Sequence, residues 1–145
     1  MKKLGKDAVI MVFVVVLGIW GGILGSQVIS VSAAEIELIK PEELKKLIDN
    51  KKADFVIVDT QPKSVYDVSH IKGAISFPWE MELKTPKNLP KDKTLILYCD
   101  CAHEEDSMDV ANQLKKKWSY TNLKILEGGW SKWQELGYPL SLIHI

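Results

Sequence analysis

The chain has 145 residues with 19 basic and 19 acidic side chains, so its formal charge is zero, and no basic face or acidic block forms along it. We therefore expect no nucleic-acid partner. All the basic residues are lysine, so arginine, which binds oxyanions in a bidentate manner, is absent. Any bound anion must be held by lysine or by backbone amides.

The N-terminal part of the chain differs from the rest. Residues 8–25 are strongly apolar and follow three lysines. A run of this length approaches what spans a bilayer, and the lysines favour a cytoplasmic N-terminus. We expect residues 1–34 to be a membrane anchor that places a single domain, residues 35–145, outside the cytoplasm. Small residues at 31–34 also suit a signal peptidase, so a secreted or periplasmic domain released by cleavage is the alternative.

The exported part begins with a helix and two short strands. Residues 40–48 carry proline and acids in the first turn and apolar side chains on one face, which predicts a helix. Residues 55–59 and 74–77 are short apolar runs typical of buried strands. A brief helical turn is expected between them, at residues 64–68.

The same alternation continues to the C-terminus. Residues 94–99 form the most hydrophobic predicted strand, and residues 107–117 have apolar side chains at helical spacing. A last strand at 123–126 precedes a helix at 130–136 that ends at Gly137. Such βα alternation predicts an α/β fold with a mainly parallel sheet and helices on both faces.

The two cysteines of the chain, Cys99 and Cys101, lie where the strand at 94–99 stops and before the helix at 107–117 begins. In an open α/β sheet this place is the usual ligand crevice. Backbone N–H groups at a helix N-terminus stabilise a thiolate, which is the nucleophilic form of cysteine. The position therefore predicts a nucleophile.

Three separated motifs occur in order between residues 39 and 140. They are Val58-Asp59-Thr60-Gln61 followed by Ser69-His70-Ile71-Lys72-Gly73-Ala74-Ile75-Ser76-Phe77-Pro78, then Tyr98-Cys99, then Glu127-Gly128-Gly129-Trp130. With these motifs the chain resembles the rhodanese-like domain family. Ordered motifs at this spacing are far more specific than one short motif.

The resemblance implies sulfur transfer. A loop cysteine takes a sulfane sulfur from a small-molecule or protein persulfide donor, forms a persulfide and passes the sulfur to a thiol or other thiophilic acceptor, with no metal or organic cofactor. The loop that would bind substrate comprises Asp100, Ala102, His103, Glu104, Glu105, Asp106 and Ser107. Asp59 is expected to orient backbone or loop groups, and His70 to hold its turn by hydrogen bonding.

The choice between the cysteines depends on the direction of counting. From the strand, the family's run into its catalytic cysteine matches Cys99. Counting back from Ser107, the usual loop length points to Cys101, so the loop is two residues longer than the common form. We prefer Cys99 because the end of a buried strand holds a side chain more tightly than mid-loop does. Cys101 would then be a resolving thiol or a second persulfide carrier.

The loop departs from the family pattern in its charge. Asp100, Glu104, Glu105 and Asp106 surround the thiols. These carboxylates are expected to raise the thiol pKa and to repel the doubly charged thiosulfate anion, which favours a neutral or cationic donor. Alternatively, Glu105 and Asp106 only stabilise the helix N-terminus, where negative charge is favourable.

Two other functions remain open. Cys99 and Cys101 would cycle as a readily reduced dithiol in a redox protein, or the fold would serve as a non-catalytic binding module. His103 completes a Cys-x-Cys-x-His pattern, but structural zinc sites combine ligand pairs from separate segments, so we expect no metal.

Overall fold

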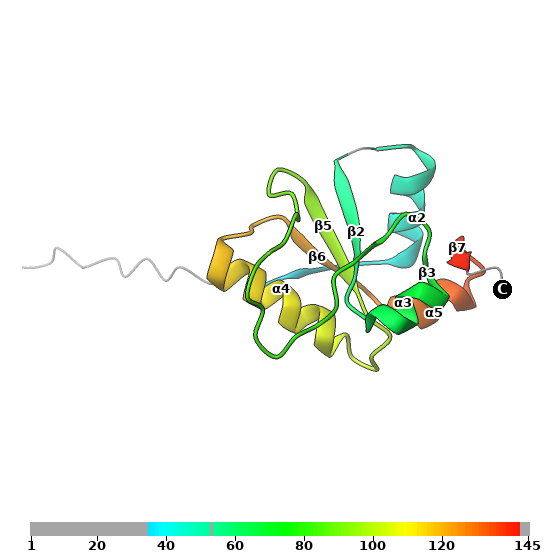
Figure 1. Ribbon diagram of the computed structural model, residues 1–145. Coiled ribbons are helices and arrows are strands. Elements are labelled where there is room, and N and C mark those ends of the chain that lie inside the picture. Colours follow the sequence, from blue (N-terminus) through cyan, green and yellow to red (C-terminus); the bar gives the residue numbers. More distant parts are fainter. Residues whose placement is uncertain (1–34, 53, 143–145) are drawn as a thin grey trace, which may run out of the picture. The chain divides into compact units, whose positions relative to one another are not determined.

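Five parallel strands form the central sheet (Figure 1). The computed structural model describes residues 35–52 and 54–142. In spatial order the strands are β1 (Glu37–Ile39), β6 (Leu123–Leu126), β5 (Thr94–Tyr98), β2 (Phe55–Asp59) and β4 (Ile75–Ser76). Because parallel strands end at the same edge, the loops that follow β5, β2 and β6 meet there.

Helices cover both faces of this sheet, as predicted. They are α2 (Pro41–Asp49), α3 (Lys63–Val68), α4 (Glu105–Trp118) and α5 (Gly129–Glu135). Successive side chains of β5 enter different cores: Leu95 packs in the core that contains residues of α4, and Ile96 packs in the core that contains Leu44 of α2 and Trp133 of α5. Figure 1 shows α4 and α2 on opposite sides of the strands. Since β5 is buried on both faces, it reads as a continuous apolar run.

Three short strands, β1, β3 and β7, were not predicted from the sequence. β1 pairs in parallel with β6, and β3 (Ser69–Ile71) pairs antiparallel with β7 (Leu140–Leu142) in a separate sheet. Each has three residues, which is too few to show a periodicity. The longer predicted elements are present, with ends displaced by one or two residues, as is usual for helix and strand boundaries.

The expected membrane anchor at residues 1–34 lies outside the described residues. Across 35–52 and 54–142, none of the helices combines the length and the apolar character needed to cross a bilayer.

Candidate active site

Cys99 follows the last residue of β5 and is buried, with 1% of its surface exposed. Its thiol donates to Ser107 Oγ at 3.7 Å, and the Ser107 hydroxyl in turn donates to the Glu104 carbonyl oxygen at 3.0 Å. The backbone is also held, because the Cys99 carbonyl accepts the Trp130 N–H at 2.9 Å. The strand end that the sequence analysis favoured for its rigidity thus also shields this sulfur from solvent.

Cys101 lies two residues further along the loop and is only half-buried. Its sulfur contacts the Cys99 thiol and receives the backbone N–H of Asp106 in the first turn of α4. Partial burial raises the pKa of the Cys101 thiol, the hydrogen bond with Cys99 raises it further, and the Asp106 amide acts in the opposite direction. The acidic sequence predicted the direction of this shift, but burial and the neighbouring thiol are its main causes.

The loop acids are tied to backbone and side-chain donors. Glu104, which precedes α4 in a left-handed conformation, accepts the Gly128 N–H at 2.7 Å. Glu105 accepts the His103 N–H at 3.2 Å, and Asp100 accepts the hydroxyl of Ser131 on α5. These carboxylates therefore fix the loop against its surroundings.

The remaining residues of the loop differ in their exposure and in their position relative to α4. Ala102 and His103 are exposed, whereas Ser107 is buried beside the Cys99 thiol. Glu105 and Asp106 occupy the first turn of α4, and the N-cap residue Glu104 makes no side-chain cap hydrogen bond. Their negative charge is nevertheless favourable at a helix N-terminus. Backbone donors, first that of Glu105 itself and then that of His103, lower the Glu105 pKa.

Gly129 is a site residue that the sequence analysis quoted only as part of a motif. Its φ is +52°, and a Cβ placed there would lie 2.0 Å from the Cys99 carbonyl oxygen. Only glycine permits this approach without displacing the backbone that carries the first thiol. The pair Gly128-Gly129 before Trp130 was the available signal, because adjacent glycines after a strand often mark a close backbone contact.

The last residue of β2 and the two residues after it hold the end of β5 just before the thiols. Asp59 is fully buried and accepts hydrogen bonds from the Tyr98 hydroxyl at 2.5 Å and from the Gln61 N–H at 2.8 Å. Burial raises the Asp59 pKa, and these hydrogen bonds oppose the rise. Thr60 donates both its N–H and its hydroxyl to the Tyr98 carbonyl, each at 2.9 Å. The residue preceding Cys99 is thereby anchored through its side chain and its backbone.

His70 lies on β3, on the separate small sheet, and its contacts are with α3. Its Nδ1 donates to the Tyr66 carbonyl oxygen at 2.8 Å, and the two rings stack with centroids 3.9 Å apart. Tyr66 also donates its hydroxyl to the Ala74 carbonyl at 2.7 Å. His70 is thus part of the contacts that hold the turn between β3 and β4.

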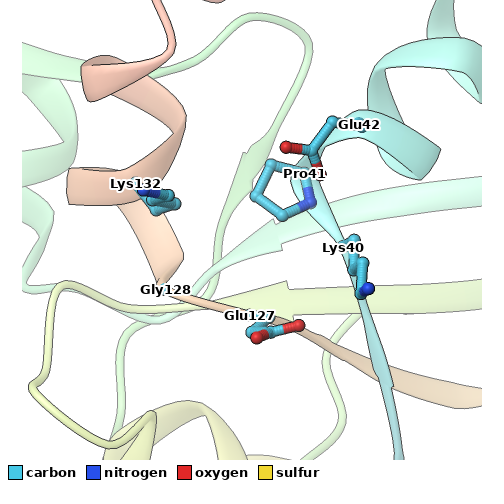
Figure 2. Close-up of a pocket in the computed structure, with 6 residues that line it drawn as sticks. All are labelled: Lys40, Pro41, Glu42, Glu127, Gly128 and Lys132. Carbon is cyan, nitrogen blue, oxygen red and sulfur yellow. The ribbon is translucent and has the colours of Figure 1, made fainter.

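A surface pocket of about 250 Å³ lies at the same edge of the sheet, where β1 and β6 end (Figure 2). Lys132 of α5 faces Pro41 and Glu42 at the start of α2 in this view. Gly128 belongs to the lining and also donates to Glu104, so the pocket adjoins the thiol loop through one hydrogen bond. Neither thiol lines it.

Metal-ligating side chains do not gather near the thiols. Over the described ranges, 35–52 and 54–142, no three or more His, Cys, Asp and Glu side chains are placed to hold an ion.

The raised thiol pKa leads to a testable pH dependence. Because the thiolate is the form that reacts, we expect the alkylation rate of Cys101 by iodoacetamide to rise with pH, with a midpoint above the value of about 8.5 for a free cysteine. In Cys99→Ala the midpoint should move towards that value, because the contact with the second thiol is lost. Peptide mass mapping measures the rate at each thiol, and a wild-type midpoint below 8.5 would contradict the assignment of causes.

Known proteins share this architecture. The family model of the rhodanese-like domain matches residues 40–136. The rhodanese-like domain of an Anabaena protein is similar in structure, with a TM-score of 0.65 and 24% identity over 75% of this chain and 81% of that one. A Bacillus halodurans protein, BH2092, has the same TM-score and identity over 72% of this chain and 76% of its own. At this identity the structural likeness supports the fold alone.

Several sequence relatives carry sulfurtransferase names. "Adenylyltransferase and sulfurtransferase UBA4" of Meyerozyma guilliermondii is 30% identical over 89 residues, which cover 57% of this chain and 21% of that protein. This chain spans between 21% and 43% of the length of the first curated relatives that it matches. The family match over most of the domain, together with the parallel sheet and the cysteine loop at its edge, shows that this chain belongs to the rhodanese-like domain family.

Proposed function

We propose that this chain is a sulfurtransferase and that Cys101 is its nucleophile. The Cys101 thiolate attacks the sulfane sulfur of a donor and forms a new S–S bond, while the donor's leaving group departs with the electron pair of the broken bond. The resulting Cys101 persulfide passes its outer sulfur to a thiophilic acceptor. One observation carries the proposal: a half-buried sulfur lies at the N-terminus of α4 with a backbone amide directed at it.

Accessibility supports Cys101 over Cys99, which the strand register favoured. A donor in solution reaches a half-buried side chain on a loop more readily than a side chain that is 1% exposed. The amide of Asp106 also supports this choice, since a hydrogen-bond donor stabilises both the thiolate and a terminal persulfide sulfur. Counting back from Ser107 points to the same residue.

Sulfur loading tests the proposal. The reduced full chain, purified in mild detergent, is mixed with an excess of cysteamine persulfide, a donor with no net negative charge, and quenched rapidly with an alkylating agent. Peptide mass mapping should then locate one added sulfur atom on Cys101. A protein that gains no sulfur at any quench time, with its fold intact, is not a sulfurtransferase of this kind.

The charge of the loop supports a neutral or cationic donor. Asp100 and Glu105 are exposed and Glu104 and Asp106 are half-buried, so a negative potential surrounds the Cys101 sulfur. A doubly charged anion such as thiosulfate is repelled by this potential, and arginine, the usual counter-charge, is absent from the sequence.

Two thiol reagents that differ in charge measure this effect. We expect 2-aminoethyl methanethiosulfonate to modify Cys101 faster than the 2-sulfonatoethyl reagent, by about tenfold more than a free thiol shows at low salt, and the ratio should shrink as salt screens the acids. Glu105→Gln is the control variant, because glutamine keeps an acceptor for His103 but removes one charge. A ratio equal to that of the free thiol would remove the argument against thiosulfate.

We propose in addition that residues 8–25 anchor the chain in a membrane with the rhodanese-like domain outside the cytoplasm. The support is the apolar sequence and the lysines that precede it. In a bacterial host, the full-length chain should remain in the membrane fraction after alkaline washing, and protease added to spheroplasts should digest its domain. A shortened chain in the soluble exported fraction would instead indicate signal cleavage, and a domain protected from protease would contradict export.

A further inference from the structure

The two thiols of the loop differ sharply in their surroundings. Cys99 is buried and donates to Ser107 Oγ at 3.7 Å, whereas Cys101 is open to solvent on one side. Only one residue separates them in the chain, and a hydrogen bond with the Cys99 thiol is among the causes that raise the Cys101 pKa. The Ser107 hydroxyl donates its own proton to the Glu104 carbonyl oxygen, so the Ser107 oxygen is oriented to accept from Cys99. The solvent-accessible Cys101 thiol can therefore react with a donor, and the buried Cys99 thiol is held close to it.

We propose that Cys99 resolves the persulfide formed on Cys101, which closes an internal disulfide and releases the outer sulfur as hydrogen sulfide. The inference rests on the proposed sulfurtransferase function, since it needs the persulfide of that reaction. It assigns Cys99 the role of a resolving thiol that acts when no external acceptor removes the sulfur. The class of product is then sulfide, in addition to a persulfidated acceptor.

The step balances without a further reactant. Cys99, as its thiolate, attacks the Cys101 Sγ and forms the Cys99–Cys101 S–S bond. The bond between Cys101 Sγ and the outer sulfur breaks, and the outer sulfur leaves with the electron pair as HS⁻ after taking the proton that Cys99 gives up. The two cysteine sulfurs are oxidised together by two electrons, and the outer sulfur is reduced from the sulfane state to sulfide. An external dithiol reopens the disulfide by exchange.

Two features favour this reaction over reaction of Cys99 with a donor. Burial keeps external donors from Cys99, but Cys101 is only two residues away and interacts with the Cys99 thiol. An intramolecular attack has a high effective concentration. A disulfide between residues separated by only one position closes a small ring, and strained disulfides are readily reduced. The pair would therefore return to the dithiol state rather than remain locked.

A single-turnover experiment with the full chain tests the inference. Wild type and Cys99→Ser are reduced, loaded with cysteamine persulfide, desalted within seconds and then followed for free sulfide and for intact mass. In the wild type we expect one equivalent of sulfide per chain and a final mass lower than that of the reduced protein by two hydrogens. In Cys99→Ser the added sulfur should persist, with sulfide release at least about tenfold slower.

The outcomes separate the inference from the function on which it rests. Sulfur that persists in the wild type as long as in Cys99→Ser overturns the resolving role but leaves the sulfurtransferase proposal intact. Failure of both proteins to gain sulfur at the earliest time overturns the sulfurtransferase proposal. Cys99→Ala repeats the test with a side chain that makes no hydrogen bond to Ser107, and thermal unfolding of each variant shows that it is folded. If Cys99→Ser and Cys99→Ala release sulfide as fast as the wild type does, an external thiol causes the release. That result also overturns the resolving role of Cys99.

Discussion

Replacing Cys101 by serine should abolish sulfur uptake from a low-molecular-weight persulfide, whereas replacing Cys99 by serine should leave the initial rate of uptake close to that of the wild type. The difference follows from accessibility: Cys99 is 1% exposed, and Cys101 is half-buried with the Asp106 amide at its sulfur. Removing a covalent nucleophile lowers the rate of its step by roughly 10³-fold or more, because serine is not ionised at neutral pH.

The measurement is donor consumption in a stopped-flow experiment, together with peptide mapping of the quenched protein. Cys99→Ser is the matched control, since its hydroxyl is able to replace the thiol as donor to Ser107 Oγ. The reverse pattern, in which Cys99→Ser is inactive and Cys101→Ser takes up sulfur, would restore the assignment by strand register. Equal uptake by both variants would show that either thiol serves as the carrier.

The sequence predicted the fold well because its longer elements carry strong patterns. In β5 the residues Leu95–Tyr98 form an apolar run that is buried on both faces, and α4 has apolar side chains at helical spacing. Both patterns depend only on residues that are close together in the chain, so they can be recognised without knowledge of the tertiary structure. The antiparallel pair of β3 and β7 could not be predicted in this way, because its partners are three residues long and lie far apart in the chain.

The candidate site was predicted in its location but not in its detail. The crevice at the strand ends follows from the order of β5 and α4, and the loop residues could be named from it. Which thiol faces solvent depends on how a loop two residues longer than the common form is folded. That is decided by contacts with distant segments, such as Glu104 with Gly128 and Asp100 with Ser131. A one-dimensional pattern holds no information on such pairs.

Gly129 provides the sharpest test of how the loop is held. Gly129→Ala should lower the free energy of unfolding by about 3 kcal/mol, because the new Cβ meets a backbone oxygen and the residue must keep a positive φ. The opposing atom is the Cys99 carbonyl oxygen at 2.0 Å, and the φ is +52°. The substitution should also reduce sulfur uptake, since relieving the clash displaces the backbone that leads to Cys101. Urea unfolding of the full chain in detergent, followed by tryptophan fluorescence, measures the loss of stability.

Gly137→Ala is the matched control because it has a similar backbone and no steric conflict. Its φ is +67°, and a Cβ there meets nothing within 4 Å. We expect a loss of about 1 kcal/mol, the cost of a left-handed conformation for alanine, with uptake unchanged. The difference between the two variants therefore isolates the contact with Cys99 from the backbone strain that both share. Equal losses in the two variants would mean that the close approach of Gly129 to Cys99 does not hold the thiol loop in place.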